Sequence, residues 1–226
     1  MTIPKLLLEV QNRRSDIIQL TSDLIKIPTI NPPGTNYREI CEFLSKRLKK
    51  SGFDVDIIRA KGALADTDKY PRFNLVARHE GTYSGPCIHF NSHIDVVDTG
   101  HGWTRDPFGG SIEGDKIFGR GSCDMKGGLA SSIVAAEVFI SIFPKYYGAI
   151  EISATADEET GGYGGVAWLA EKGYFNPKKV QSVIIPEPLN KDRICLGHRG
   201  VWWSEIETKG SCLLYTSDAA DDSLRV

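Results

Sequence analysis

The chain has 226 residues, of which 41% are hydrophobic and 25% are charged, and its formal net charge is -2. This composition is typical of a globular protein with one sizeable core, or with one domain and part of another. The near-neutral charge gives no reason to expect nucleic acid or an anionic membrane surface as a partner. No apolar run approaches the length of a membrane span.

The cysteines and the N-terminal residues indicate in which cellular compartment the protein is expected. The five cysteines are scattered and include no Cys-x-x-Cys pair, which argues against a disulfide framework and for a reducing environment. Residues 1–5 lack the basic and apolar regions of a secretion signal. We therefore expect the protein in the cytoplasm.

Two amphipathic helices are predicted in the first 50 residues. Apolar residues at helical spacing indicate one over Val10–Ile27, which Pro28 ends, and a second over Tyr37–Lys50, with Gly52 just past its end. Composition predicts a loop at residues 31–34 between them. Short apolar runs then predict three strands, with a turn before the third: residues 53–58, 73–77 and 87–90, the turn lying at 81–86.

The rest of the chain continues to alternate between strands and helices. The patterns predict a hairpin at 109–118, a long helix at 125–143, a strand at 149–156, a short helix at 166–172 and a strand at 182–185. This alternation predicts an α/β fold, a mostly parallel mixed sheet flanked by helices. In such sheets ligands bind at the carboxyl ends of the strands.

The pair His93 and Asp95 follows the third predicted strand. At period two both side chains lie on one side of the chain. The imidazole can bind a metal ion through one nitrogen, while the carboxylate can fix the ring or bind as well. A His-x-Asp sequence by itself is more often a surface pair, so the metal hypothesis depends on further candidate ligands downstream.

Three further acidic signals come at the ends of predicted elements: Asp124, the pair Glu158 and Glu159, and Glu187. Each signal alone has a plainer interpretation: Asp124 as a turn residue, Glu158 and Glu159 as a solvated acidic loop, and Glu187 as a charge in a loop. The glycines after Glu159 could likewise form a flexible loop. Adjacent carboxylates repel, however, and a metal ion bound to one leaves the other as a base beside it. With His93 the set suits zinc, cobalt or manganese, as one ion or two. The residues alone therefore predict a metal-dependent hydrolase.

Five motifs in this order and spacing carry a family resemblance: Ser92–Val97, Trp103–Gly110, Gly119–Gly128, Asp157–Gly162 and Pro186–Pro188. They resemble the zinc-dependent amidohydrolase and exopeptidase family, which includes acetylornithine deacetylase, succinyl-diaminopimelate desuccinylase, aminoacylase and glutamate carboxypeptidase. The resemblance covers roughly residues 10–210.

The resemblance implies a set of metal ligands. By position, His93 corresponds to the terminal ligand of a first zinc ion, and Glu187 to a second carboxylate on that ion. Asp124 corresponds to the carboxylate that bridges two ions, and Glu159 to a ligand of the second. The family also has a cis peptide bond after the bridging aspartate, which predicts one between Asp124 and Met125.

The resemblance also implies a reaction. Glu158 corresponds to the general base, and Asp95 to the residue that orients the His93 ring. The expected activity is hydrolysis of the amide bond of an N-acyl amino acid. The alternatives are a metallo-carboxypeptidase or dipeptidase that acts on small peptides, and a non-catalytic metal-binding fragment.

The C-terminal part departs from the family pattern, which needs one more histidine downstream and an inserted lid or dimerisation domain. We expect residues 1–193 to form an incomplete catalytic domain and residues 194–211 the first part of the lid. Residues 212–226 resemble the translation of a sequencing adapter, so we expect a non-native tail there. This chain by itself is then expected to be inactive, and the intact protein to dimerise through its lid.

Overall fold

A computed structural model describes residues 3–189, 192–197, 200, 204 and 206–207. The chain divides into two compact units, residues 1–190 and 191–226. The described residues of the second unit contain no helix or strand. The predicted tail at 212–226 lies outside the described residues, as does most of the predicted lid segment, so the domain assignment stays a prediction.

The first unit is built around a five-stranded sheet in the order β1-β2-β6-β3-β7. β6 runs parallel to β3, and β3 parallel to β7, whereas β2 is antiparallel to both β1 and β6. Four of the five strands therefore point the same way, which confirms the mostly parallel mixed sheet. The strands are β1 (Asp54–Arg59), β2 (Phe73–Glu80), β3 (Tyr83–His93), β6 (Tyr147–Thr155) and β7 (Val180–Ile184).

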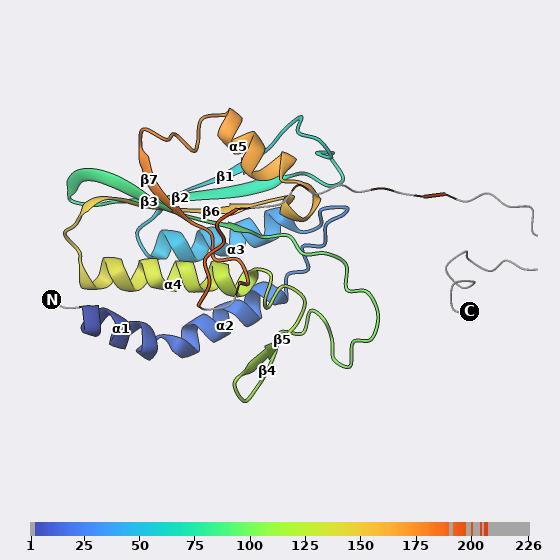
Figure 1. The fold of residues 1–226 in the computed structure, drawn as a ribbon, viewed down its shortest axis with the longest axis horizontal. Coiled ribbons are helices and arrows are strands. Elements are labelled where there is room, and N and C mark those ends of the chain that lie inside the picture. Colours follow the sequence, from blue (N-terminus) through green and yellow to red (C-terminus); the bar gives the residue numbers. More distant parts are fainter. Residues whose placement is uncertain (1–2, 190–191, 198–199, 201–203, 205, 208–226) are drawn as a thin grey trace, which may run out of the picture. The chain divides into compact units, whose positions relative to one another are not determined.

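Helices cover the sheet unequally (Figure 1). α3 (Tyr37–Lys50) and α4 (Lys126–Ile142) lie against one face, and α1 (Ile3–Asn12) and α2 (Arg14–Ile25) pack on α4 from outside. The short α5 (Trp168–Glu171) lies on the other face. The hairpin of β4 (Ser111–Glu113) and β5 (Lys116–Phe118) stands apart from the sheet. None of the helices in the described part of the chain is long and apolar enough to cross a membrane.

The core lies between the sheet and α3 and α4. The apolar stripe predicted on the second helix is buried there, with Ile40, Leu44 and Leu48 fully inaccessible. β6 is buried along its whole length after Tyr147, as befits a central strand with neighbours on both sides. This central position places the carboxyl end of β6 directly beside that of β3.

Two expectations about element boundaries were wrong. The first predicted helix breaks at Arg13, which leaves helical geometry (φ -92°, ψ 11°) and pairs with Glu137 of α4 at 2.8 Å. The predicted turn at 81–86 is shorter, because β3 already begins at Tyr83. A Cβ on Gly85 would lie 2.7 Å from the backbone nitrogen of Gly148, so that glycine serves a close approach between chain segments.

Candidate metal centre

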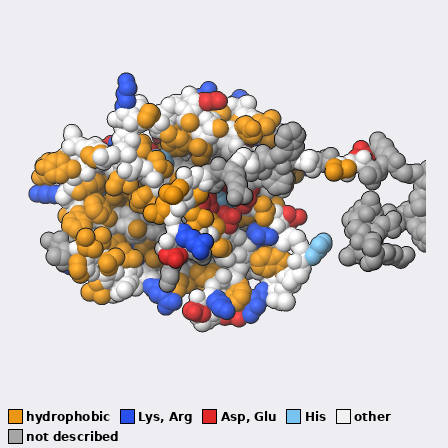
Figure 2. Space-filling view, viewed as in Figure 1, with side chains coloured by type: hydrophobic (Ala, Val, Ile, Leu, Met, Phe, Trp, Pro, Cys, Tyr) orange, Lys and Arg blue, Asp and Glu red, His pale blue; other side chains and the backbone are white. Residues whose placement is uncertain are grey.

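The strand order brings the predicted site residues to one edge of the sheet. His93 ends β3 and pairs with Thr155, which ends the parallel strand β6. The turn η1 (Glu158–Thr160) follows β6, and Glu187 follows the end of β7. Asp124 comes from the loop before α4. Figure 2 shows acidic side chains gathered in this region, and the carboxyl ends of three neighbouring strands thus converge on one centre.

Distances around the His93 ring define the centre. Nε2 of His93 lies 2.9 Å from Asp124 Oδ1, 3.8 Å from Glu187 Oε1 and 3.9 Å from Glu158 Oε2. One potential ligand atom from each of His93, Asp124 and Glu159 lies within 4.8 Å of the other two. The histidine is almost fully buried, with 1% of its side chain exposed, whereas Glu158 is 54% exposed. The glutamate carboxylate therefore faces the solvent.

The ionisation of these groups shows an excess of negative charge. Burial alone would lower the pKa of His93, but its contacts with Asp124 and Asp95 outweigh burial and raise that pKa to about 11. Burial and the neighbouring Asp124 carboxylate raise the pKa of Glu159 to about 7, and burial raises that of Glu187 to about 7. In this site the carboxylates take up protons near neutral pH and the imidazole of His93 is protonated. A divalent cation could replace these protons, so the donor set fits such an ion.

Asp95 lies beside the Nδ1 atom of the His93 ring and also binds the turn that carries Glu158 and Glu159. Nδ1 of His93 is 2.9 Å from the main-chain carbonyl oxygen of Asp95 and 3.5 Å from its carboxylate. That carboxylate is fully buried and accepts hydrogen bonds from the backbone N–H groups of Glu158 (3.2 Å) and Glu159 (3.1 Å). Asp95 therefore ties the end of β3 to the turn that carries both glutamates.

The residue before this turn is held by an ion pair that sequence reasoning did not identify. Asp157 adopts a left-handed backbone (φ 62°) and, with its side chain 3% exposed, pairs with the equally buried Arg72 at 3.0 Å. Tyr37 donates a further hydrogen bond to it at 3.1 Å. Arg72 follows a proline in a loop, and nothing in its local sequence signals contact with a residue 85 positions away.

Two of the four glycines after Glu159, Gly164 and Gly165, pack closely, unlike the flexible loop that was one interpretation of this segment. A Cβ on Gly164 would collide with the side chains of Asp157 and Arg72, and one on Gly165 with the carbonyl oxygen of Ala156. The absence of side chains here lets the segment after η1 lie directly against the end of β6. This close packing fixes the turn of Glu158 and Glu159 from its C-terminal side.

The start of α4 positions Asp124. The peptide bond between Asp124 and Met125 is cis, as predicted. The next residue, Lys126, is fully buried and donates hydrogen bonds to the carbonyl oxygens of Leu24 (3.0 Å) and Ile27 (2.7 Å), which fasten α4 to the end of α2. Burial lowers the pKa of Lys126 to about 7. Lys126 lies inside the motif Gly119–Gly128, but the motif gave it no separate role.

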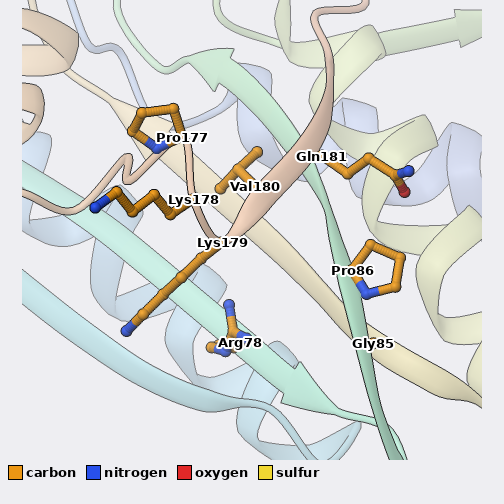
Figure 3. Close-up of a pocket in the computed structure, with 8 residues that line it drawn as sticks. All are labelled: Arg78, Gly85, Pro86, Pro177, Lys178, Lys179, Val180 and Gln181. Carbon is orange, nitrogen blue, oxygen red and sulfur yellow. The ribbon is translucent and has the colours of Figure 1, made fainter.

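A separate hollow of about 510 Å³ lies at the other end of the strands (Figure 3). It is lined by Arg78, Gly85, Pro86 and residues 177–181, and therefore opens beside the beginnings of β3 and β7. Arg78 is already paired with Glu80 at 2.6 Å. This hollow contains none of the predicted site residues and takes no part in the metal centre.

The chain is similar in sequence to known proteins. The family model for peptidase family M20/M25/M40 matches residues 89–212. Succinyl-diaminopimelate desuccinylase of Stenotrophomonas maltophilia (strain K279a) is 32% identical over 202 residues, covering 87% of this chain and 50% of that protein. The chain thus spans about half the length of the curated relatives it matches.

Solved structures share the fold. The di-peptidase Dug1p from Saccharomyces cerevisiae superimposes with a TM-score of 0.68 at 21% identity, covering 81% of this chain and 40% of that one. The M20 family metallo-carboxypeptidase Sso-CP2 from Sulfolobus solfataricus gives 0.62 at 24% identity, covering 75% and 37%.

Proposed function

Because the chain belongs to peptidase family M20/M25/M40, we propose that it forms the metal-binding part of a hydrolase for the amide bond of N-acyl amino acids. The observation that carries this proposal is the buried imidazole of His93, with carboxylates from three separate segments within 4 Å of its Nε2. The desuccinylase relatives favour an N-acyl amino acid such as a succinylated one as the substrate class.

We propose that His93, Asp124, Glu159 and Glu187 hold the metal, as two zinc ions in the intact enzyme, with cobalt or manganese as alternatives. When bound, the metal lowers the pKa of an attacking water and polarises the amide carbonyl. The protein residues keep the donor set fixed and partly shielded from water. Their carboxylates share the negative charge that the ions neutralise.

Glu158 is the residue we propose as the general base. Its carboxylate takes a proton from the attacking water, whose oxygen bonds to the amide carbon. The C–N bond then breaks, and the same proton passes to the leaving nitrogen, so that the products are an amine and a carboxylic acid, which releases its remaining proton to solvent at neutral pH. Its exposure fits this role, because the base must reach both water and substrate.

The test has two stages, since the chain spans about half its relatives' length. Residues 1–226 are expected to bind zinc without turnover, as measured by calorimetry and a hydrolysis assay. The longest reading frame of the source gene that contains residues 1–210 is expected to hydrolyse N-succinyl or N-acetyl amino acids. Preferential cleavage of dipeptides would favour the dipeptidase or carboxypeptidase alternative, and zinc binding without any hydrolysis would favour the non-catalytic one.

Glu158→Gln in that longer protein separates catalysis from metal binding. The variant is expected to keep its zinc content and to lose at least about a hundredfold in kcat, the usual contribution of a positioned base. A loss below about tenfold would remove Glu158 from the base role. Glu158→Asp serves as the control, because it keeps the carboxylate and shortens only its reach.

The compartment and the oligomer are further proposals. The described cysteines Cys41, Cys87, Cys123 and Cys195 are all free thiols, which supports a reducing compartment such as the cytoplasm. We propose that the intact protein dimerises through its lid, which light scattering of the longer protein would test. A monomer at micromolar concentration would contradict this.

A further inference from the structure

Asn31 lies in the loop between α2 and α3 and is 1% exposed. Its backbone N–H donates to the carbonyl oxygen of Val96 at 2.9 Å, and the N–H of Val96 donates to the carbonyl oxygen of Thr29 at 3.0 Å. These bonds form a short parallel bridge between Ile30 and Val96. The loop is thus fixed against the segment that follows β3, which carries Asp95.

The side-chain amide of Asn31 joins two parts of the metal centre. Its Nδ2 donates one hydrogen bond to Asp95 Oδ2 at 2.8 Å and another to Thr160 Oγ1 at 2.9 Å. Asp95 lies next to the His93 ring, and Thr160 lies in the turn with both glutamates. Because a carboxylate only accepts hydrogen bonds, turning the amide over would set two oxygens against each other, so this orientation is determined by its surroundings.

The Asp95 carboxylate depends on these donors, because a buried charge is costly unless hydrogen-bonded. Its Oδ2 accepts from Asn31 and from the backbone N–H of Glu159, and its Oδ1 from that of Glu158. Without the Asn31 amide, Oδ2 would keep the Glu159 bond as its only partner among the described residues. The carboxylate and the turn would then be free to shift together.

We propose that Asn31 is a positioning residue of the metal centre. Asp95 already joins the turn of Glu158–Thr160 through two backbone N–H groups. Asn31 holds the carboxylate and this turn together against the loop between α2 and α3, and so keeps Glu159 at the distance from His93 and Asp124 that metal binding needs. This proposal rests on the proposed metal-dependent function. It extends that function to a loop residue outside every motif of the site.

The experiment titrates residues 1–226 with Co²⁺, whose visible absorption reports the coordination geometry. Asn31→Ala is expected to bind cobalt about ten- to a hundredfold more weakly, the usual effect of removing a residue that orients metal ligands. Its spectrum at saturating cobalt is expected to differ from that of the wild type, which a merely structural role would not cause. Circular dichroism and urea unfolding establish whether the variant is folded.

Asn36→Gly is the matched control. Asn36 lies in the same loop and has a left-handed backbone (φ 55°) that glycine adopts freely. Among the described residues, its side chain donates only to the carbonyl oxygen of Pro28. Its cobalt affinity is expected within about twofold of the wild type. Thr160→Val removes the other end of the Asn31 bridge without changing shape, and is expected to weaken cobalt binding and alter the spectrum in the same direction.

The outcomes separate the two proposals. A wild-type chain that binds no cobalt would overturn both the metal centre and the role of Asn31. A wild-type chain that binds cobalt, with a folded Asn31→Ala variant of equal affinity and unchanged spectrum, would overturn only the role of Asn31. Should Asn31→Ala fail to fold, an unchanged affinity and spectrum in Thr160→Val would overturn it equally.

Discussion

Gly128→Ala is expected to weaken metal binding, even though alanine is the better helix former. Gly128 lies in the first turn of α4, where the segment after β7 crosses the helix. A Cβ at this position would lie closer than 3.0 Å to the carbonyl oxygen of Pro186 and 3.1 Å from its Cγ. Pro186 directly precedes Glu187, so any displacement passes to that carboxylate.

The magnitude follows from two opposing effects. Alanine in place of glycine inside a helix gains about 1 kcal/mol, whereas overpacking a close contact costs about 1–3 kcal/mol. An ordinary contact begins at 3.4 Å, so Pro186 has to move by on the order of 1 Å because backbone cannot rotate away. The net change in unfolding free energy is therefore a loss of about 0–2 kcal/mol. A shift of Glu187 by about 1 Å is expected to weaken zinc binding about tenfold.

Isothermal titration of zinc into residues 1–226, with urea unfolding of the metal-free protein, measures both quantities. Ser131→Ala is the control, because Ser131 is exposed on α4 and its hydroxyl donates to the carbonyl oxygen of Gly127 in the same helix. Zinc affinity of Gly128→Ala within about twofold of the wild type would refute the reasoning. It would show either that Pro186 moves without Glu187 or that Glu187 contributes little to binding.

Three further predictions concern charge. Arg72→Met leaves the buried Asp157 without its ion-pair partner and is expected to lower the free energy of unfolding by about 3–5 kcal/mol at pH 7, measured by urea unfolding. Burial raises the pKa of Asp157, so the folded variant takes up a proton more readily than the unfolded chain, and the loss of stability should shrink as pH falls. A loss that stays constant with pH would contradict this. Hydrogen bonds from Arg47, opposed by burial, lower the pKa of Asp16 to about 2 from 3.8, so its stabilisation is present above about pH 4 and is lost as pH falls through about 2. Asp16→Asn should cost about 1–2 kcal/mol at pH 7, allowing for solvent screening, and this cost should become small below about pH 2; a cost that is the same at both pH values would contradict this. Zinc affinity should fall as pH drops from about 8 to 6, because Glu159 and Glu187 bind protons near pH 7 that zinc must displace. Calorimetry in buffers of different ionisation enthalpy would detect the released protons. Zinc binding without proton release would contradict the assignment of these two glutamates as metal ligands.

Local sequence determined the elements that carry the site. Short apolar runs identified the five strands of the sheet, and patterns typical of helices identified α3 and α4, because the distribution of apolar residues follows from how strands and helices are buried. The strand-end rule then predicted that His93, Glu158, Glu159 and Glu187 lie at one edge of the sheet, and the structure places them there. The end of a strand fixes the position of the residue that follows it, because the strand itself is fixed in the sheet.

Only the tertiary structure decided which strand ends are neighbours and what holds them. β6 inserts between β2 and β3, and this order arises from contacts across the whole chain, which no local window contains. The same reason hid Asn31, Arg72 and Lys126: each looks locally like an ordinary loop or helix residue, and each is buried only because distant segments close over it. Once such a residue is buried, its polar atoms need hydrogen-bond partners, and the distant segments supply them. The sequence therefore determined the chemical groups of the site, and the packing of remote segments determined how firmly they are held.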